Sequence, residues 1–215
     1  MPKWSRSNPL ALAVLVSLYE RPMHPYEVAQ TLRQRAKQES VRLNYGSLYA
    51  VVESLEKKGF IKATGTTREG KRPERTVYEI TDDGTREMED WMTELIGVPA
   101  KEYPAFMAGL SFLPSLDPDD ALVALRGRAD ALTVKLAAMR GAMKAATDAG
   151  LPRIFELEAE YEEAQLAAEL KFVKALVKEM EEGTLDGLDM WRIFHTEGFN
   201  AEEVNFNLDF DLSQE

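Results

Sequence analysis

The sequence of 215 residues contains no cysteine, and its two histidines, His24 and His195, lie far apart in the chain. Without cysteine the chain cannot form a disulfide scaffold, a thiolate zinc site or a cysteine nucleophile. Two isolated histidines also make a histidine-rich metal site within one chain unexpected. We therefore expect the protein to hold neither a metal nor another cofactor.

Long hydrophobic runs are missing too, since no stretch reaches the roughly 18 apolar residues of a membrane-spanning helix. One segment resembles a secretion signal, because Lys3 and Arg6 precede an apolar run over residues 10–19. However, Glu20-Arg21-Pro22 stands where a small-residue cleavage site would be needed. A buried first helix explains the run better, and we expect a cytoplasmic protein without a membrane partner.

Motifs of catalysis are also absent. Glu156, Glu160 and Glu163 would share one face of a predicted helix, but no histidine has the Glu-x-x-His spacing of di-metal bundle sites. A Gly-x-x-x-x-Gly-Lys run at residues 65–71 continues with arginine instead of the serine or threonine of a phosphate-binding loop. A solvated helix face and a hairpin tip explain these residues, so we expect no enzyme.

The chain has a net charge of −11, but its basic and acidic residues are unevenly distributed along the sequence. Residues 1–86 carry 15 lysines and arginines against 10 acidic residues, a local charge of +5. Residues 87–215 carry 11 against 27, a local charge of −16. A basic first part joined to an acidic second part indicates two functions in one chain, and the basic part suits nucleic acid although the total charge argues against it.

The basic part has the pattern of three short helices followed by a β-hairpin. Asn8-Pro9 is a typical helix start, and Gly59 stands where a left-handed helix cap is expected. The third helix carries an apolar stripe at helical spacing, made of Leu48, Val51, Val52 and Leu55. The expected helices cover about residues 9–19, 25–37 and 44–59, and the expected strands cover residues 60–63 and 76–80. This order, with a basic linker between the strands, is typical of a winged helix-turn-helix.

The acidic part is predicted to be helical. A fourth helix, from Thr81 to about Ile96, would turn Met88, Trp91, Met92 and Leu95 inward, and a short helix follows around residues 105–112. Two long helices joined by a turn at residues 150–152 have apolar residues at spacings of three and four, as in coiled coils. One helix pair cannot cover both of its apolar seams, so we expect a homodimer. The candidate interface residues are Leu122, Leu125, Leu132, Leu136, Met139, Leu166, Leu170, Val173 and Val177.

The last segment is acidic and contains no lysine or arginine after Arg192. Apolar and polar residues alternate from Val204 to Leu212, a period of two that indicates a strand. A tail without fixed structure is the alternative. The domains expected from these patterns are a DNA-binding domain at 1–97, a dimerisation domain at 98–186 and an acidic tail at 187–215.

Three stretches of the sequence resemble the PadR family of bacterial transcriptional regulators. They are NPLALAVLVSLYERPMHPYEVAQTL at 8–32, NYGSLYAVVESLEKKGFI at 44–61 and RTVYEITDDG at 75–84, within a similarity that covers about residues 8–95. The resemblance implies a winged helix-turn-helix that binds DNA, followed by two long helices that make a dimer. Two features depart from the family: His24-Pro25-Tyr26 stands where the family often has a glycine before the tyrosine, and the acidic tail after about Gly183 has no counterpart.

The third predicted helix would read the DNA bases, since the N-terminal end of this helix enters the major groove in helix-turn-helix proteins. Cations near its end and in the strand linker would bind phosphates or the minor groove. Two alternatives stay open: Asn44 only caps the helix, and Tyr49 belongs to the core with its hydroxyl at the surface. The candidate DNA-binding residues are Asn44, Tyr45, Ser47, Tyr49, Lys57, Arg68, Lys71 and Arg72.

Met88, Trp91 and Met92 form a candidate site for a flat apolar or aromatic effector, because aromatic and methionine side chains favour such ligands. Plain core packing is the alternative for these three residues.

The sequence as a whole predicts a mainly α protein with a small β-hairpin, in which a winged helix-turn-helix precedes a long antiparallel dimerisation hairpin. The expected function is an effector-responsive repressor that binds a pseudo-palindromic double-stranded DNA operator as a homodimer. The alternative from another class is an acidic helical protein-interaction module that keeps the winged-helix shape without binding DNA.

Overall fold

The computed structural model describes residues 6, 8–35, 37, 41, 44–67 and 75–196. Its contacts divide the chain into two compact units, Met1–Glu102 and Tyr103–Glu215. The fold is mainly helical with one two-stranded antiparallel sheet, as predicted. None of the described helices combines the length and the apolar character needed to span a bilayer.

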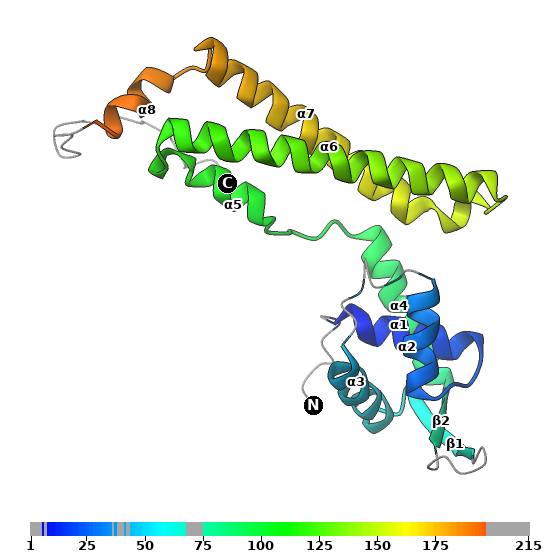
Figure 1. Ribbon diagram of the computed structural model, residues 1–215. Coiled ribbons are helices and arrows are strands. Elements are labelled where there is room, and N and C mark those ends of the chain that lie inside the picture. The colour runs from blue at the N-terminus through cyan, green and yellow to red at the C-terminus, as the bar shows by residue number, and fades with distance from the viewer. Residues whose placement is uncertain are drawn as a thin grey trace. The chain divides into compact units, whose positions relative to one another are not determined.

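The first unit has the predicted order of three helices, a hairpin and a fourth helix (Figure 1). Several elements differ by a few residues from the prediction, and two of these differences concern the helix and the strand that border the site. The second helix ends at Gln34 and not at Lys37, and the first strand continues past Ala63 to Thr67 because a β-bulge between Ala63 and Gly65 keeps it paired. The elements are α1 (Pro9–Glu20), α2 (Pro25–Gln34), α3 (Tyr45–Lys57), β1 (Ile61–Thr67), β2 (Arg75–Ile80) and α4 (Asp82–Gly97).

Capping residues fix where these helices begin and end. The Asn8 side chain accepts a hydrogen bond from the Leu10 N–H at 3.1 Å, and Pro9 opens α1. The Thr81 hydroxyl likewise accepts from the Gly84 N–H at 3.1 Å at the start of α4. Gly59 has a φ of 77°, the left-handed conformation predicted after α3. The side chains satisfy backbone N–H groups that the first helical turn leaves without a partner.

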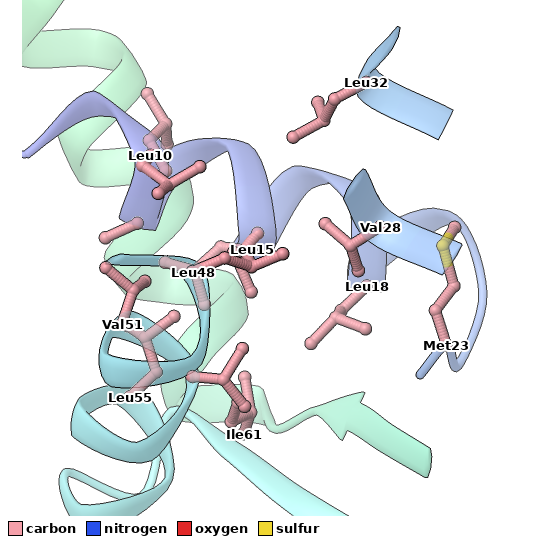
Figure 2. Close-up of a cluster of buried hydrophobic side chains, with 14 of the residues drawn as sticks. Leu10, Leu15, Leu18, Met23, Val28, Leu32, Leu48, Val51, Leu55 and Ile61 are labelled. Carbon is pink, nitrogen blue, oxygen red and sulfur yellow. The ribbon is translucent and has the colours of Figure 1, made fainter. Parts of the chain in front are cut away.

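Helix α1 is the centre of the first unit's core. Figure 2 shows Leu15 and Leu18 of α1 close to side chains of α2 and α3, and Ile61 of β1 lies beside Leu55. Leu15, Leu48 and Leu55 are completely buried. Because each such side chain contributes about 1.5–3 kcal/mol on burial, this cluster holds α3 firmly against α1.

The inward face of α4 is narrower than the sequence predicted. Met88 and Trp91 are buried, but Met92 is 38% exposed and Leu95 is 55% exposed in the described structure. Positions 84, 88 and 91 are the buried ones on α4, at spacings of four and three residues along a single line of the helix. Met92 and Leu95 do not belong to that line of contact, so the prediction that both point inward is wrong for the single chain.

The second unit is built around two long helices, α6 and α7, which run antiparallel side by side (Figure 1). Four cations of α6 pair with four carboxylates of α7, from Arg126 with Glu181 near one end to Arg140 with Glu163 near the other. The elements of this unit are α5 (Ala105–Ser111), η1 (Leu113–Ser115), α6 (Pro118–Asp148), η2 (Arg153–Phe155), α7 (Leu157–Glu182) and α8 (Leu188–Phe194).

Part of the predicted dimer seam is already covered within one chain. Leu125, Leu132, Leu136 and Val173 are at most 9% exposed, and Leu125, Leu132 and Val173 belong to the core of the second unit. In the single chain these four residues therefore pack the second unit together, and their part in a dimer stays a prediction. The remaining candidates are partly exposed: Leu122, Met139, Leu166, Leu170 and Val177.

Helix α8 lies where the sequence suggested the beginning of an acidic tail. Leu188 and Trp191 are buried in the core of the second unit, and the indole N–H of Trp191 donates to the Leu116 carbonyl oxygen at 2.8 Å. The segment that begins at residue 187, predicted from its charge to be an acidic tail, therefore starts with a helix packed on the second unit. The predicted strand over Val204–Leu212 lies outside the described residues.

Candidate nucleic-acid interface

Helix α3 has one face in the core and the opposite face in solvent. The predicted apolar stripe is buried, with Leu48 and Leu55 completely so. The helical repeat consequently turns Ser47, Tyr49, Ala50 and Glu53 outward. Since the core side of α3 is fixed against α1, the direction of this outward face is fixed as well.

Among the predicted DNA-binding residues of α3, Ser47 and Tyr49 lie on this outward face. Ser47, Tyr49 and Lys57 are exposed, and Tyr49 retains 49% of its surface, so it is not the core residue of the alternative interpretation. Tyr45 is the first residue of α3. Asn44 is exposed and caps α3, since its side-chain oxygen accepts from the Gly46 N–H at 2.9 Å.

Asn44 therefore caps α3, while its assignment to DNA binding and the alternative that it only caps the helix both stay predictions. The predicted wing cations Arg68, Lys71 and Arg72 lie outside the described residues. Their assignment to DNA binding stays a prediction.

The base of the hairpin is tied to the turn between α1 and α2. Met23 and Tyr78 exchange two backbone hydrogen bonds, each 3.0 Å long, as an isolated antiparallel bridge beside β2. Lys62 and Glu79 face each other across the hairpin and form an ion pair at 2.8 Å. These two backbone hydrogen bonds join the segment before α2 to β2 and so fix the position of the hairpin relative to α2.

A hollow of about 500 Å³ lies between the start of α2, the outward face of α3 and β2. Tyr49 and Tyr78 contribute aromatic rings to it, and Glu53 and Glu56 contribute carboxylates. Glu53 and Glu56 were not among the residues predicted from the sequence, although Glu53 follows Tyr49 by four residues and so shares its helix face. The full lining consists of His24, Pro25, Tyr49, Ala50, Val52, Glu53, Glu56, Thr76 and Tyr78.

The hollow has a negative electrostatic character at its hairpin side. Burial raises the pKa of the Tyr78 phenol above its ordinary value, and the nearby charge of Glu56, a hydrogen bond to Glu56 and the charge of Glu53 raise this pKa further. All of these effects disfavour the negatively charged, deprotonated form of Tyr78. Tyr78 is therefore a neutral hydrogen-bond donor at neutral pH.

His24, in the stretch that departs from the family pattern, has a structural role at the start of α2. Its Nδ1 accepts from the Tyr26 N–H at 3.0 Å, and the Glu27 carboxylate accepts from the His24 N–H at 2.8 Å. This reciprocal arrangement is a capping box, in which histidine takes the place of the usual serine or threonine. It fixes the helix start that borders the hollow.

The three candidate effector residues do not share one environment. Met88 and Trp91 belong to the core of the first unit, while Met92 is on the exposed side of α4. This arrangement favours the alternative of core packing for Met88 and Trp91. The effector assignment stays a prediction.

The three carboxylates considered for a di-metal site have other partners. Glu163 pairs with Arg140 at 2.5 Å, and Glu160 pairs with Arg153 at 2.8 Å, which lowers the pKa of Glu160. Glu156 is buried and accepts from the Thr147 hydroxyl at 3.2 Å. Each carboxylate stabilises the pair of helices α6 and α7 or the turn between them, so the prediction of a merely solvated face was too simple.

Comparison with known proteins shows which proteins this chain resembles. Residues 14–90 match the model of the transcriptional regulator PadR-like family. The negative transcriptional regulator PadR of Bacillus subtilis (strain 168) is 24% identical over 132 residues, which cover 61% of this chain and 71% of that protein.

Solved structures agree at the level of the fold. The crystal structure of Bacillus subtilis PadR in complex with operator DNA has a TM-score of 0.56 at 22% identity and covers 86% of this chain and 99% of its own. The structure of the same protein in complex with p-coumaric acid has a TM-score of 0.63 at 16% identity and covers 83% and 98%. Taken with the buried and exposed faces of α3 and the hairpin that follows it, these similarities agree with the expected resemblance: residues 14–90 of the chain match the PadR-like family of transcriptional regulators, and the fold is that of the solved PadR structures.

Proposed function

We propose that the protein is a sequence-specific repressor that binds a pseudo-palindromic operator as a homodimer and responds to a small aromatic effector. The outward face of α3 would enter the major groove of each half-site, and the wing would contact the adjacent backbone or minor groove. The observation that carries this proposal is the rigid presentation of Ser47 and Tyr49 at the capped N-terminal end of α3.

Charge supports the same arrangement. Residues 1–86, which include α3 and the wing, carry a net charge of +5 although the whole chain carries −11. Lysines and arginines that neutralise phosphates supply most of the sequence-independent affinity for DNA. The negative charge of the second part would repel DNA, so that α6 and α7 stay away from it and remain available for dimerisation.

A second apolar face on α6 supports the homodimer. Opposite the residues that pack on α7, this helix exposes a line of small or apolar residues, and Val123 and Val134 retain 67% and 71% of their surface. Such a line of small and apolar residues on a 31-residue helix would let a second helix approach closely along its length. The exposed line consists of Val123, Gly127, Ala131, Val134, Ala138, Gly141 and Ala145.

The proposed effector class comes from the relative that was solved with p-coumaric acid, a small aromatic acid. In this dimer an effector would shift the equilibrium between two states, in which the spacing of the two winged helices does or does not fit DNA. Such a shift requires that the effector binds one of the two states more tightly than the other. Met92, which is exposed on α4, is the candidate contact among the three predicted residues.

An electrophoretic mobility-shift titration tests the proposal, with DNA fragments from the neighbourhood of the protein's own gene. We expect a shifted complex at submicromolar protein whose affinity falls steeply with salt, as phosphate contacts require. Absence of salt-sensitive binding at micromolar protein would contradict the proposal and favour the acidic protein-interaction module.

A further inference from the structure

Glu53 has an unusual position for a surface meant to approach a polyanion. It is exposed near the middle of the outward face of α3, one helical turn after Tyr49, and its side chain lines the hollow beside the hairpin. In the described part of the first unit, ion pairs involve Glu20, Glu27, Asp83, Glu87 and other carboxylates, but not Glu53. A carboxylate without such neutralisation would repel phosphates.

The location of Glu53 on the helix resolves this apparent conflict. Base contacts of a recognition helix begin at its N-terminal residues and, in homeodomain-type helix-turn-helix proteins, extend along its exposed face into the middle of the helix, while phosphates lie at the borders of the groove. Ala50, three residues earlier on the same face, carries only a methyl group, so no bulky side chain stands beside Glu53 on that side. Glu53 can therefore reach the floor of the groove.

The chemistry of the groove then selects one base. A carboxylate only accepts hydrogen bonds, and cytosine presents an isolated N4 amino donor in the major groove. Guanine presents two acceptors there, thymine presents one acceptor and a methyl group, and adenine places its N7 acceptor next to its amino donor. Cytosine is thus the base that a carboxylate contacts with the least repulsion.

Glu56 does not have the same freedom. It hydrogen-bonds the Tyr78 phenol at the base of the hairpin, and its charge contributes to the raised pKa of that phenol. Glu56 is therefore committed to joining α3 to β2, whereas Glu53 acts on Tyr78 only through its charge.

We propose that Glu53 is a specificity-determining residue that accepts a hydrogen bond from the N4 amino group of one cytosine in each operator half-site. This inference rests on the proposed function, because it requires that α3 lies in the major groove. It assigns a base to a residue that the sequence analysis did not include among its DNA contacts.

Selection of bound duplexes from a random pool tests it, with the wild-type chain, Glu53→Gln and the control Glu89→Gln in parallel. Glu89→Gln removes the same charge from an exposed position of α4 outside the hollow. Thermal melting of each variant establishes that it is folded, which is expected because both substitutions keep the shape of an exposed helical side chain.

We expect the wild type and Glu89→Gln to prefer cytosine over adenine by at least about tenfold at one position of each half-site, the equivalent of one good base contact. Glu53→Gln should lose this preference or favour adenine, because glutamine pairs with the N6 and N7 of adenine. The other positions of the selected sequence should stay the same.

Two results would overturn the inference while leaving the proposed function intact. In the first, Glu53→Gln would select the same base as the wild type at every position. In the second, Glu53→Gln would bind all sequences more tightly by one common factor, which would mean that Glu53 only repels DNA. If the wild type enriches no sequence at all, the proposed function itself is wrong and the inference is wrong with it.

Discussion

The backbone of Phe60 occupies the space that a side chain at Gly84 would need. A Cβ atom at Gly84 would lie 2.0 Å from the Phe60 carbonyl oxygen and 2.8 Å from Cγ1 of Ile80. The same carbonyl oxygen accepts the Thr81 N–H at 3.0 Å, so the start of α4 is joined to the start of the hairpin. Glycine at position 84 is what allows this close approach.

Gly84→Ala should therefore destabilise the protein by at least about 2 kcal/mol, because a backbone atom has to move. The matched control is Gly97→Ala at the end of the same helix, where a Cβ meets nothing within 4 Å. That change should stay within about 0.5 kcal/mol of the wild type. Chemical denaturation followed by circular dichroism measures both, and equal stability of the two variants would refute the close contact.

Tyr78 provides a prediction about pH. Its pKa is raised in the folded protein above the ordinary value of 10.0, so the folded state favours the neutral phenol. The resulting contribution to stability is fully present below pH 10 and is lost as the pH rises through the folded pKa. Ultraviolet titration of tyrosinate, with Tyr78→Phe as the difference reference, reports this pKa directly.

Glu56→Gln should lower the pKa of Tyr78 without restoring the ordinary value, since burial is the largest cause of the shift. Glu89→Gln, on α4 outside the hollow, should leave this pKa unchanged. A titration of Tyr78 that does not respond to Glu56→Gln would show that the two side chains are not in contact in solution.

Tyr49→Ala and the double change Arg68→Ala/Arg72→Ala should weaken DNA binding in different ways. Loss of a base contact by Tyr49 should cost roughly 1–3 kcal/mol and relax the sequence preference. Loss of wing cations should weaken binding to all sequences and reduce the salt slope by about one unit per phosphate contact. Titrations at several salt concentrations distinguish the two effects, and an unchanged salt slope for the double variant contradicts the wing assignment.

Val134→Glu should dissociate the proposed dimer without unfolding the chain. Val134 is 71% exposed in the single chain, so the substitution costs little there, but an unpaired charge in a helix interface weakens association by at least about tenfold. Gln30→Glu on α2 adds the same charge at an exposed position far along the sequence and should leave the dimer intact. Sedimentation velocity measures both, and a Val134→Glu variant as dimeric as the wild type places the interface elsewhere.

The first unit was largely predictable because local signals and burial agree there. Asn8, Gly59 and Thr81 are capping residues in the sequence, and each of them takes that role in the structure. The apolar stripe of α3 is buried as its spacing requires. This agreement among neighbouring signals is what makes a sequence specify its fold.

The second unit was less predictable because charge and periodicity are ambiguous there. The heptad spacing of α6 indicated an apolar seam but not whether α7 or another chain covers Leu125 and Leu132. Trp191 was assigned to a tail because its neighbours are acidic, although one indole and Leu188 suffice to anchor a short helix. Glu53 was missed because no short-range pattern shows that β2 returns to the side of α3 on which it lies.

The ratio of affinities for specific and non-specific DNA tests the central claim most directly. Fluorescence anisotropy at physiological salt would compare the duplex selected by the wild type with a scrambled duplex of the same length and composition. A sequence-specific regulator should bind the selected duplex at least about a thousandfold more tightly. Equal affinity for the two duplexes would contradict base reading by α3 and reduce the interaction to phosphate attraction alone.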